Sequence, residues 1–279
     1  MNCPNKFNYE VMNTSLDILL PNIDFRDAKT IAYESFQRLC YLEDLLSMYR
    51  AGSDIAMLNE IPVGEVIKLA DVSLDCLLEA FHASEISKGA IDVCMGDFFL
   101  KAKNDTFFPR IENPTRGKFA IDVENLLVQK LENGRIDLGG IGKGFGLDYI
   151  YENLLEHWEI KDAFISFGGS SILALGKDEN GKDWQINLSD TMSLPIKNAF
   201  VGASGTSVLG QHIIDCRTGE LPKNQPFRTW AISGIGAIAD AMSTAFMILA
   251  KDEIKEICQE HNLVGAIQQT PESQIEIFE

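Results

Sequence analysis

Cysteine is scarce in this sequence, and its spacing excludes two common roles. The six cysteines form no C-x-x-C pair and no zinc-ribbon spacing. They are also too sparse for the disulfide framework of a small secreted domain. A reducing compartment is therefore the simplest interpretation. The cysteines lie at positions 3, 40, 76, 94, 216 and 258.

Positive charge is also in short supply. There are 24 Lys and Arg residues against 41 Asp and Glu residues, so the formal net charge is -17. A field of that sign repels nucleic-acid backbones and anionic lipid surfaces. We therefore expect no nucleic acid and no membrane among the primary partners. A small ligand that carries phosphate would need local positive charge or a metal ion.

The sequence lacks the usual marks of export. Residues 1–20 show no charged start followed by an apolar segment and a cleavage site, and Cys3 comes too early to follow a lipoprotein signal. We expect a cytoplasmic protein, or one whose export signal has been removed.

Residues 231–250 carry a single charge and could be mistaken for a membrane span. Gly234, Gly236 and Asp240 interrupt this stretch, and it has no flanking aromatic or basic anchors. These features favour a buried strand followed by a buried helix, so we expect no membrane span.

What is present is a globular composition, with 46% hydrophobic residues over 279 positions. That is enough for a sizeable core. Hydrophobic spacing predicts helices over 26–49, over a short segment capped by Ser53 or Asp54, and over 69–89, 140–158 and 239–258. Alternation predicts strands over 14–21, 118–131, 135–138, 162–176, 184–188, 199–205, 212–216, 265–270 and 275–279, with Glu132 to Gly134 joining the second to the third.

Helices and strands are interspersed without a steady βαβ alternation, which indicates the α+β class. No internal repeat, low-complexity tract or linker divides the chain. We therefore expect one domain over residues 1–279, with mixed or antiparallel sheets and packed helices.

A glycine-rich segment, residues 136–148, follows a strand pattern and opens a helix. Backbone N–H groups and the helix dipole at such a place can hold a phosphate. The segment is not a P-loop, because Lys143 is followed by Gly144, and no G-x-G-x-x-G frame fits. A tight turn that needs positive φ is the alternative interpretation. Lys143, between two glycines, is well placed for an anion.

Two further glycine turns, at 165–171 and 202–206, match no nucleophile elbow. Thr206 stands where the G-x-S-x-G frame around Ser204 requires glycine, so a serine hydrolase is disfavoured.

Of the four histidines, only His212 is a candidate general base. It opens an apolar pair that leads to Asp215 and a Gly/Pro turn. We expect His82, His157 and His261 to be solvated or structural.

Asp240 is the single charge of the stretch 231–250. On a helix it shares a face with Thr244, four residues on, and Ser243 lies beside it. Asp240 could be the N-cap of the last helix. Alternatively, its carboxylate, a hydroxyl and nearby carbonyls form an oxygen-only ligand set suited to Mg²⁺. Such an ion is usually bound by protein oxygens and a substrate phosphate together.

Seven blocks of sequence occur in a characteristic order. They are VMNTSLDI, LLSMYRAGSDIAMLNE, SKGAIDVCMG, RIDLGGIGKGFGLD, AFISFGGSS, ASGTSVLGQHIIDCRTGELP and ADAMSTAFMILA. Together they resemble the ApbE family of flavin transferases, which move the FMN part of FAD onto a Ser or Thr hydroxyl of a target protein. The resemblance extends over residues 7–257 and implies an ApbE-like fold.

The resemblance implies roles for particular residues. A magnesium ion would be held by Asp240, Thr244, the carbonyl of Gly140 and Ser243. Tyr49 would lie against the isoalloxazine ring. We hypothesise that His212, which the resemblance places at the FAD site, is the general base, with Lys143 and Asp240 completing the catalytic set. The residues implied for FAD binding are Met12, Tyr49, Ala90, Ile91, Asp92, Asp137, Lys143 and His212.

Three departures from the family pattern bear on substrate fit. Where the family usually has Met-Gly-Thr, this chain has Met-Asn-Thr, so Asn13 replaces the glycine. Cys216 replaces a proline. The segment IDVCMG replaces a Phe-Asp-Pro form. None of these changes removes a residue implied for the metal, nor Lys143.

The expected function is that of a Mg²⁺-dependent FAD:protein FMN transferase that releases AMP. Its partners would be FAD and an acceptor flavoprotein with a Ser or Thr target site. Two alternatives stay open: a pyrophosphatase that splits FAD into FMN and AMP, and a flavin-binding protein without turnover.

Overall fold

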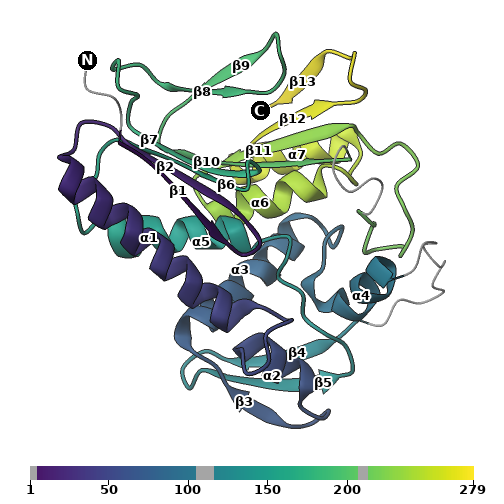
Figure 1. Ribbon diagram of the computed structural model, residues 1–279. Helices are drawn as coiled ribbons and strands as arrows, with labels where there is room; N and C mark the ends of the chain where they lie inside the picture. The colour runs from purple at the N-terminus through teal and green to yellow at the C-terminus, as the bar shows by residue number, and fades with distance from the viewer. Residues whose placement is uncertain (1–4, 105–115, 207–212) are drawn as a thin grey trace.

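The computed structural model describes residues 5–104, 116–206 and 213–279, and Figure 1 shows their arrangement. The helices are α1 (Phe25–Leu46), α2 (Asp54–Glu60), α3 (Asp71–Ile86), the short η1 (Val93–Met95), α4 (Gly96–Asn104), α5 (Gly142–Ile150), the π-helix η2 (Tyr151–Leu155), α6 (Gly236–Ala245) and α7 (Lys251–His261). The strands are β1 (Asn5–Val11), β2 (Thr14–Leu20), β3 (Val66–Lys68), β4 (Lys118–Asp122), β5 (Leu127–Glu132), β6 (Ala163–Phe167), β7 (Ser171–Leu175), β8 (Trp184–Asn187), β9 (Ser193–Ile196), β10 (Ala199–Gly205), β11 (Arg228–Ser233), β12 (Val264–Gln268) and β13 (Ile275–Phe278).

An eight-stranded sheet organises the upper part of the molecule (Figure 1). Its order is β1-β2-β6-β7-β10-β11-β12-β13, and every neighbouring pair is antiparallel. Successive side chains of a strand point to opposite faces, so Trp230 of β11 packs with Trp184 of the β8–β9 hairpin while Ala231 joins the core under the helices. The hairpin thus covers one face, and α1, α5 and α6 cover the other.

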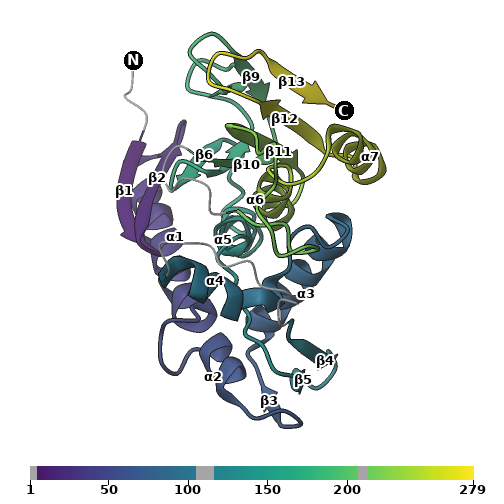
Figure 2. The ribbon, with the colours of Figure 1, turned by 90° about the vertical axis from the view of Figure 1, so that its right-hand side faces the viewer.

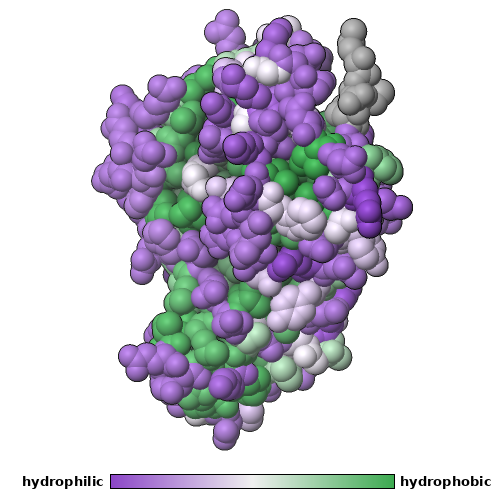
Figure 3. Space-filling model, turned by 90° about the vertical axis from the view of Figure 1, so that its left-hand side faces the viewer, coloured by the Kyte–Doolittle hydropathy of each residue, from purple (hydrophilic) through white to green (hydrophobic). Residues whose placement is uncertain are grey.

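The lower part of the molecule holds α2, α3, α4 and a small antiparallel sheet of order β3-β5-β4 (Figures 1 and 2). Its surface includes exposed apolar side chains at Val63, Val66, Val123 and Leu131. Figure 3 shows apolar surface gathered at this lower end. That surface lies at the opposite end of the molecule from the large sheet.

The α+β class and several elements agree with the sequence-based predictions. Ser53 caps α2 by accepting a hydrogen bond from the Ala56 N–H at 3.0 Å. Gly89, with φ +78°, lies just beyond α3. No helix of the described residues is long and apolar enough to cross a membrane. The stretch 231–250 holds the end of β11 and then the buried helix α6.

The predicted position of one strand connection is wrong. The β4–β5 hairpin turns at residues 123–126, not at Glu132 to Gly134, because the Asp122 carboxylate accepts hydrogen bonds from both the backbone and the side chain of Asn125. Residues 135–138 form no strand. Their backbone groups bond to distant segments instead, as where the Gly96 N–H donates to the Arg135 carbonyl at 2.8 Å.

Two further boundaries differ from the prediction. The helix expected over 239–258 is two helices, because a new one begins at Lys251, where the Glu253 carboxylate accepts the Ala250 N–H at 2.8 Å. Of the strand expected over 212–216, the described residues 213–216 form no strand, and a turn follows at 216–219. There, Asp215 pairs with Glu220 as an isolated bridge.

Candidate active site

Asp240 lies in the second turn of α6, not at its start. The N-cap of α6 is Ile235, whose side chain makes no capping bond. The first N–H groups of α6, those of Gly236 and Ala237, donate instead to the Asp148 carboxylate of α5 at 2.6 and 2.7 Å. The interpretation of Asp240 as an N-cap is therefore wrong, and Asp240 needs another explanation.

Close backbone contacts bring Asp240 into the interior. A Cβ at Gly144 of α5 would lie 2.1 Å from the Gly236 carbonyl oxygen and 2.7 Å from the Asp240 Cβ. A Cβ at Gly202 of β10 would lie 2.1 Å from the Ala239 carbonyl oxygen. Glycine at both positions lets α6 approach α5 and β10 at backbone distance. Asp240 is consequently only 5% exposed.

Three groups surround the Asp240 carboxylate. Its Oδ1 accepts a hydrogen bond from the Ser171 hydroxyl at 2.8 Å, and its Oδ2 accepts the Gly144 N–H at 3.0 Å. The Lys143 Nζ lies 3.7 Å from Oδ2. Burying a carboxylate is costly unless it is paired and hydrogen-bonded. The start of α5, rich in glycine and N–H donors, meets both needs.

Hydroxyl groups cluster at the far end of α6. The Ser204 Oγ of β10 lies 2.9 Å from the Ser243 Oγ and 3.1 Å from the Thr244 Oγ1. Ser243 also donates to the Asp240 backbone carbonyl at 2.8 Å. One carboxylate and three hydroxyls thus occupy adjacent turns of one helix and the strand beneath it. Oxygen-only donors of this kind suit hard cations such as Mg²⁺.

The chemistry of these donors restricts the kind of ion they could hold. Among residues 5–104, 116–206 and 213–279, no group of three or more His, Cys, Asp or Glu side chains is arranged to hold a metal ion. A site here would therefore combine one carboxylate with neutral oxygens, which leaves coordination positions for water and phosphate, as Mg²⁺ prefers.

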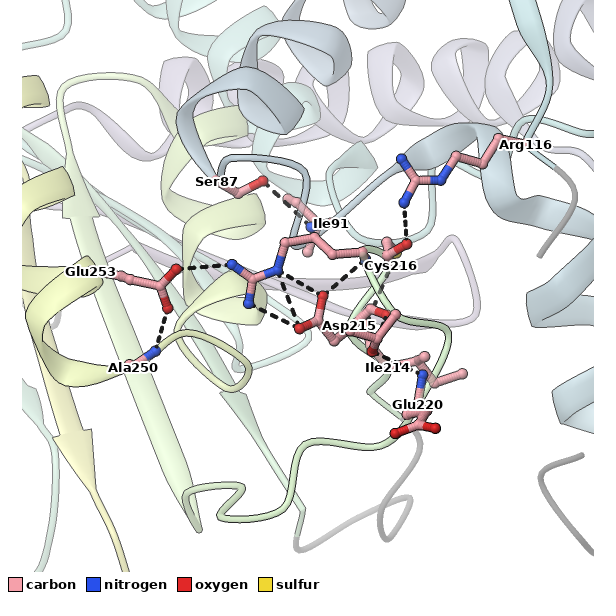
Figure 4. A network of polar contacts seen from close by, with 11 residues as sticks. Ser87, Ile91, Arg116, Ile214, Asp215, Cys216, Glu220, Ala250 and Glu253 are labelled. Atoms are coloured by element: carbon pink, nitrogen blue, oxygen red, sulfur yellow. Dashed lines mark hydrogen bonds and ion pairs between the residues drawn. The ribbon is translucent and has the colours of Figure 1, made fainter. Parts of the chain in front are cut away.

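The segment from Ala90 to Asp92, which was expected to contact FAD, is bonded to the turn at Cys216; Figure 4 labels Ile91 and Cys216. Ala90 is buried, and its carbonyl accepts the Cys216 N–H at 3.0 Å. The Asp92 carboxylate caps η1 by accepting the Cys94 N–H at 2.9 Å. The Arg116 Nε lies 3.9 Å from the Asp92 Oδ2, and the same guanidinium donates to the Cys216 carbonyl. A proline at position 216 could not supply the N–H, so this link depends on the cysteine's backbone.

Asp137 is fixed against that segment. The side chain of Asn59 bonds both backbone groups of Ile136, at 2.7 and 2.9 Å. The Asp137 N–H donates to the Val93 carbonyl at 2.9 Å, and its Oδ1 accepts the Gly139 N–H at 2.8 Å. The glycine-rich stretch that leads into α5 therefore lies beside the segment 90–93.

An arginine connects the turn after residue 213 to α7 (Figure 4). Arg217 donates to both oxygens of Asp215, at 2.9 to 3.2 Å, and to Glu253 at 2.9 Å. The hydrogen bonds to Asp215 raise the pKa of Arg217 above its ordinary value, so it stays charged. Burial raises the pKa of the adjacent Cys216 thiol to about 12, which makes that thiol unreactive.

Other predicted site residues are more dispersed. Met12 and Asn13 form the β1–β2 turn with φ of 50° and 58°, a left-handed pair that asparagine tolerates better than most residues. Tyr49 is exposed in the turn after α1, and Gly140 is exposed in the turn before α5. His212 lies outside the described residues.

Sequence reasoning missed four residues that the structure brings to Asp240 or its helix, namely Asp148, Ser171, Ser204 and Thr229. Ser171 begins β7 and Ser204 lies within β10, in two segments that were considered only as nucleophile elbows; the turn expected over 202–206 is strand as far as Gly205. Asp148 is the last residue of the glycine-rich segment and accepts the first N–H groups of α6. Each is separated from Asp240 by many positions along the chain, so only the paired strands and the crossing of α5 with α6 reveal the contact.

A buried carboxylate, a lysine at a glycine-rich helix start and a hydroxyl cluster thus lie together on an antiparallel α+β fold. Comparison with known proteins agrees. The chain belongs to the ApbE family, whose family model matches residues 12–267.

Relatives with established names resemble the chain over most of its length. The FAD:protein FMN transferase of Haemophilus influenzae is 24% identical over 251 residues, which cover 78% of this chain and 72% of that protein. The enzyme of the same name from Vibrio cholerae is 23% identical over 254 residues, which cover 81% of this chain and 75% of that protein.

Solved structures share the fold. The flavinyl transferase ApbE of Pseudomonas stutzeri, in its apo form, superposes with a TM-score of 0.84 at 18% identity, covering 100% of this chain and 96% of that one. The flavin transferase ApbE of Vibrio cholerae gives a TM-score of 0.80 at 20% identity, covering 99% and 96%.

Proposed function

We propose that this protein is a Mg²⁺-dependent FAD:protein FMN transferase. It would move FMN from FAD to a Ser or Thr hydroxyl of an acceptor flavoprotein and release AMP. Membership of the ApbE family and the names of the relatives support the reaction. The observation that carries the proposal is the buried Asp240 carboxylate beside Lys143, with hydroxyls at the end of the same helix.

The donors fit magnesium by their chemistry. The Asp240 carboxylate and the Thr244 hydroxyl would hold the ion, with the Gly140 carbonyl and Ser243 as further candidates. When bound, Mg²⁺ supplies positive charge that neutralises diphosphate oxygens and makes the phosphorus easier to attack.

The protein's own groups would orient the substrate. Lys143 at the start of α5 offers a cation, and the helix dipole adds partial positive charge at that end. Asp137 and the segment from Ala90 to Asp92 would contact FAD, together with Met12 and with Tyr49 against the flavin ring. Because the net charge of the chain is -17, Lys143 matters more here than in a neutral protein.

The transfer step exchanges one phosphorus–oxygen bond for another. The acceptor hydroxyl oxygen bonds to the FMN phosphorus, and the bond from that phosphorus to the bridging oxygen breaks. AMP leaves with the electron pair. The hydroxyl proton goes to a base, the role that we assign to His212, and such a positioned base contributes on the order of 10²- to 10⁴-fold in rate.

A product assay tests the proposal. The purified protein is incubated with FAD and Mg²⁺, with and without a cell lysate as the source of acceptor, and AMP and FMN are quantified by chromatography. Denaturing gels are read for covalent flavin fluorescence. We expect AMP together with a fluorescent protein band only when lysate is present.

The controls separate the alternatives. Asp240→Asn should abolish AMP release, while Glu65→Gln, an equivalent change at an exposed site, should leave it intact. Free FMN and AMP in the absence of lysate would identify a pyrophosphatase instead. Bound FAD without any AMP would identify a flavin-binding protein, and either result would overturn the transferase proposal.

A further inference from the structure

We propose that Ser204 and Thr229 are positioning residues, a cross-strand hydroxyl pair that fixes the end of α6 and turns the Thr244 hydroxyl toward a metal ion. The inference rests on the proposed function, because it concerns the same site. It adds two residues on neighbouring strands to the four that are implied for the metal.

The register of the large sheet creates the pair. Ser204 of β10 and Thr229 of β11 lie directly opposite each other in the antiparallel ladder. Opposed residues of such a ladder project to the same face. Both side chains meet α6, and the end of that helix therefore rests on two hydroxyls from two different strands.

Thr229 serves the backbone of the helix end. Its hydroxyl, fully buried, donates to the Ser243 carbonyl at 2.5 Å. The Phe246 N–H donates to the Met242 carbonyl, and the Met247 N–H donates to the Thr244 carbonyl. The backbone hydrogen bonds at this helix end therefore skip the Ser243 carbonyl. A buried carbonyl left unpaired is costly, and Thr229 supplies its donor.

Ser204 sets the direction of the hydroxyl protons. Each hydroxyl has one proton to donate. Ser243 gives its proton to the Asp240 carbonyl, which can only accept. The bond between Ser204 and Ser243 must therefore use the proton of Ser204, and the bond between Ser204 and Thr244 must use the proton of Thr244.

This chain of donors has a chemical consequence. A cation binds a hydroxyl through an oxygen lone pair, so the proton must point elsewhere. Because Thr244 directs its proton at Ser204, its lone pairs are available to an ion. Ser243 accepts from Ser204 and donates to Asp240, so it serves the hydroxyl chain rather than the ion. Thr244 and Asp240 then remain as the side-chain ligands.

Metal affinity measured without FAD tests the inference. Mn²⁺ prefers the same oxygen ligands as Mg²⁺ and can be followed by electron paramagnetic resonance. Groups that orient metal ligands typically change affinity by about 10- to 100-fold when removed. We expect weakening of that size in Ser204→Ala and Thr229→Val, and near wild-type affinity in Thr229→Ser, which keeps the hydroxyl.

Several outcomes would overturn it. If wild type binds Mn²⁺ and Ser204→Ala binds it within about twofold, the proton-direction argument fails while the metal site stands. If Thr229→Ser weakens binding as much as Thr229→Val, the hydroxyl is not the cause. If wild type binds no Mn²⁺, the proposed metal site fails, and this inference with it. Near-UV circular dichroism of each variant, compared with wild type, establishes that it is folded.

Discussion

Two aspartates on adjacent helices, the buried Asp240 and the partly buried Asp148, have different partners, although only Asp240 attracts notice in the sequence. Asp240 faces a lysine and a hydroxyl, whereas the Asp148 carboxylate accepts the backbone N–H groups at the start of α6. Burial raises the pKa of Asp148 to about 7, against the lowering effect of those N–H groups. A carboxylate that caps a helix and resists ionisation makes the helix start sensitive to pH.

Replacing Asp148 should reveal that sensitivity. Between the ordinary pKa of an unfolded aspartate and about 7, the folded chain keeps a proton that the unfolded chain releases, so stability from this group falls as pH rises. From pH 5 to pH 7, wild type should therefore lose unfolding free energy relative to Asp148→Asn, by at most about 1.4 kcal/mol per pH unit. Urea titrations at each pH measure it.

A companion substitution separates the charge from the cap. Asp148→Ala removes both acceptors and should cost about 1–2 kcal/mol at pH 7, as loss of a helix cap usually does. Unfolding curves for wild type and Asp148→Asn that keep a constant separation at every pH would contradict the raised pKa.

At the scale of elements, the crossing of α5 and α6 decides where the site can form. The two helices touch through glycine backbones, and the Gly144 N–H reaches the Asp240 carboxylate only because no side chain intervenes. The crossing thus couples packing to chemistry, since any widening removes a hydrogen bond from a buried charge.

Gly144→Ala should separate the helices. The added methyl would overlap the Gly236 carbonyl, so we expect a loss of about 1–3 kcal/mol in unfolding free energy, as for other overpacked sites. Gly142→Ala is the matched control, because nothing lies within 4 Å of its Cβ. Urea unfolding measures both, and equal stabilities for the two variants would show that the crossing adjusts freely.

Local signals in the sequence predicted most of the long helices to within a few residues, and most strands, but not α4 or the start of α7. A cap at Ser53 or Asp54, strand character over 162–176 and the buried helix after 231 follow from capping chemistry and hydrophobic spacing, although 162–176 is two paired strands rather than one. The connection at 123–126 was missed because an aspartate–asparagine turn competes with the more familiar Asn-Gly signal.

The site was predictable in part and for a definable reason. Asp240, Ser243 and Thr244 are close along one helix, so periodicity groups them. Ser171 and Ser204 join them only through strand pairing, and the approach of α5 depends on glycines whose role is the absence of a side chain. Neither effect leaves a periodic trace in a single sequence.

At the scale of the whole molecule, charge opposes the proposed substrate. A chain with net charge -17 repels the FAD diphosphate at long range, while Lys143 attracts it only at close range. Salt shortens the range of both effects, from about 30 Å at 0.01 M to about 10 Å at 0.1 M. The long-range repulsion is therefore screened first.

The association rate of FAD should accordingly rise with salt. We expect an increase of roughly two- to tenfold between 0.01 M and 0.1 M salt, measured by stopped-flow quenching of flavin fluorescence. Riboflavin lacks the phosphates and serves as the control, with a rate that salt leaves nearly unchanged. A rate that falls with salt would mean that local cations steer the encounter.

Strand β11 contacts α6 on one face of the sheet and the β8–β9 hairpin on the other. Thr229 bonds the end of α6, and the next residue, Trp230, packs on the opposite face with the β8–β9 hairpin. A ligand that shifts α6 should also displace β11 through the Thr229 hydrogen bond, and the Trp230 indole would then change its fluorescence emission. The fluorescence of Trp230 should therefore report movement of α6, because Trp230 is adjacent in sequence to Thr229, the residue that anchors the helix.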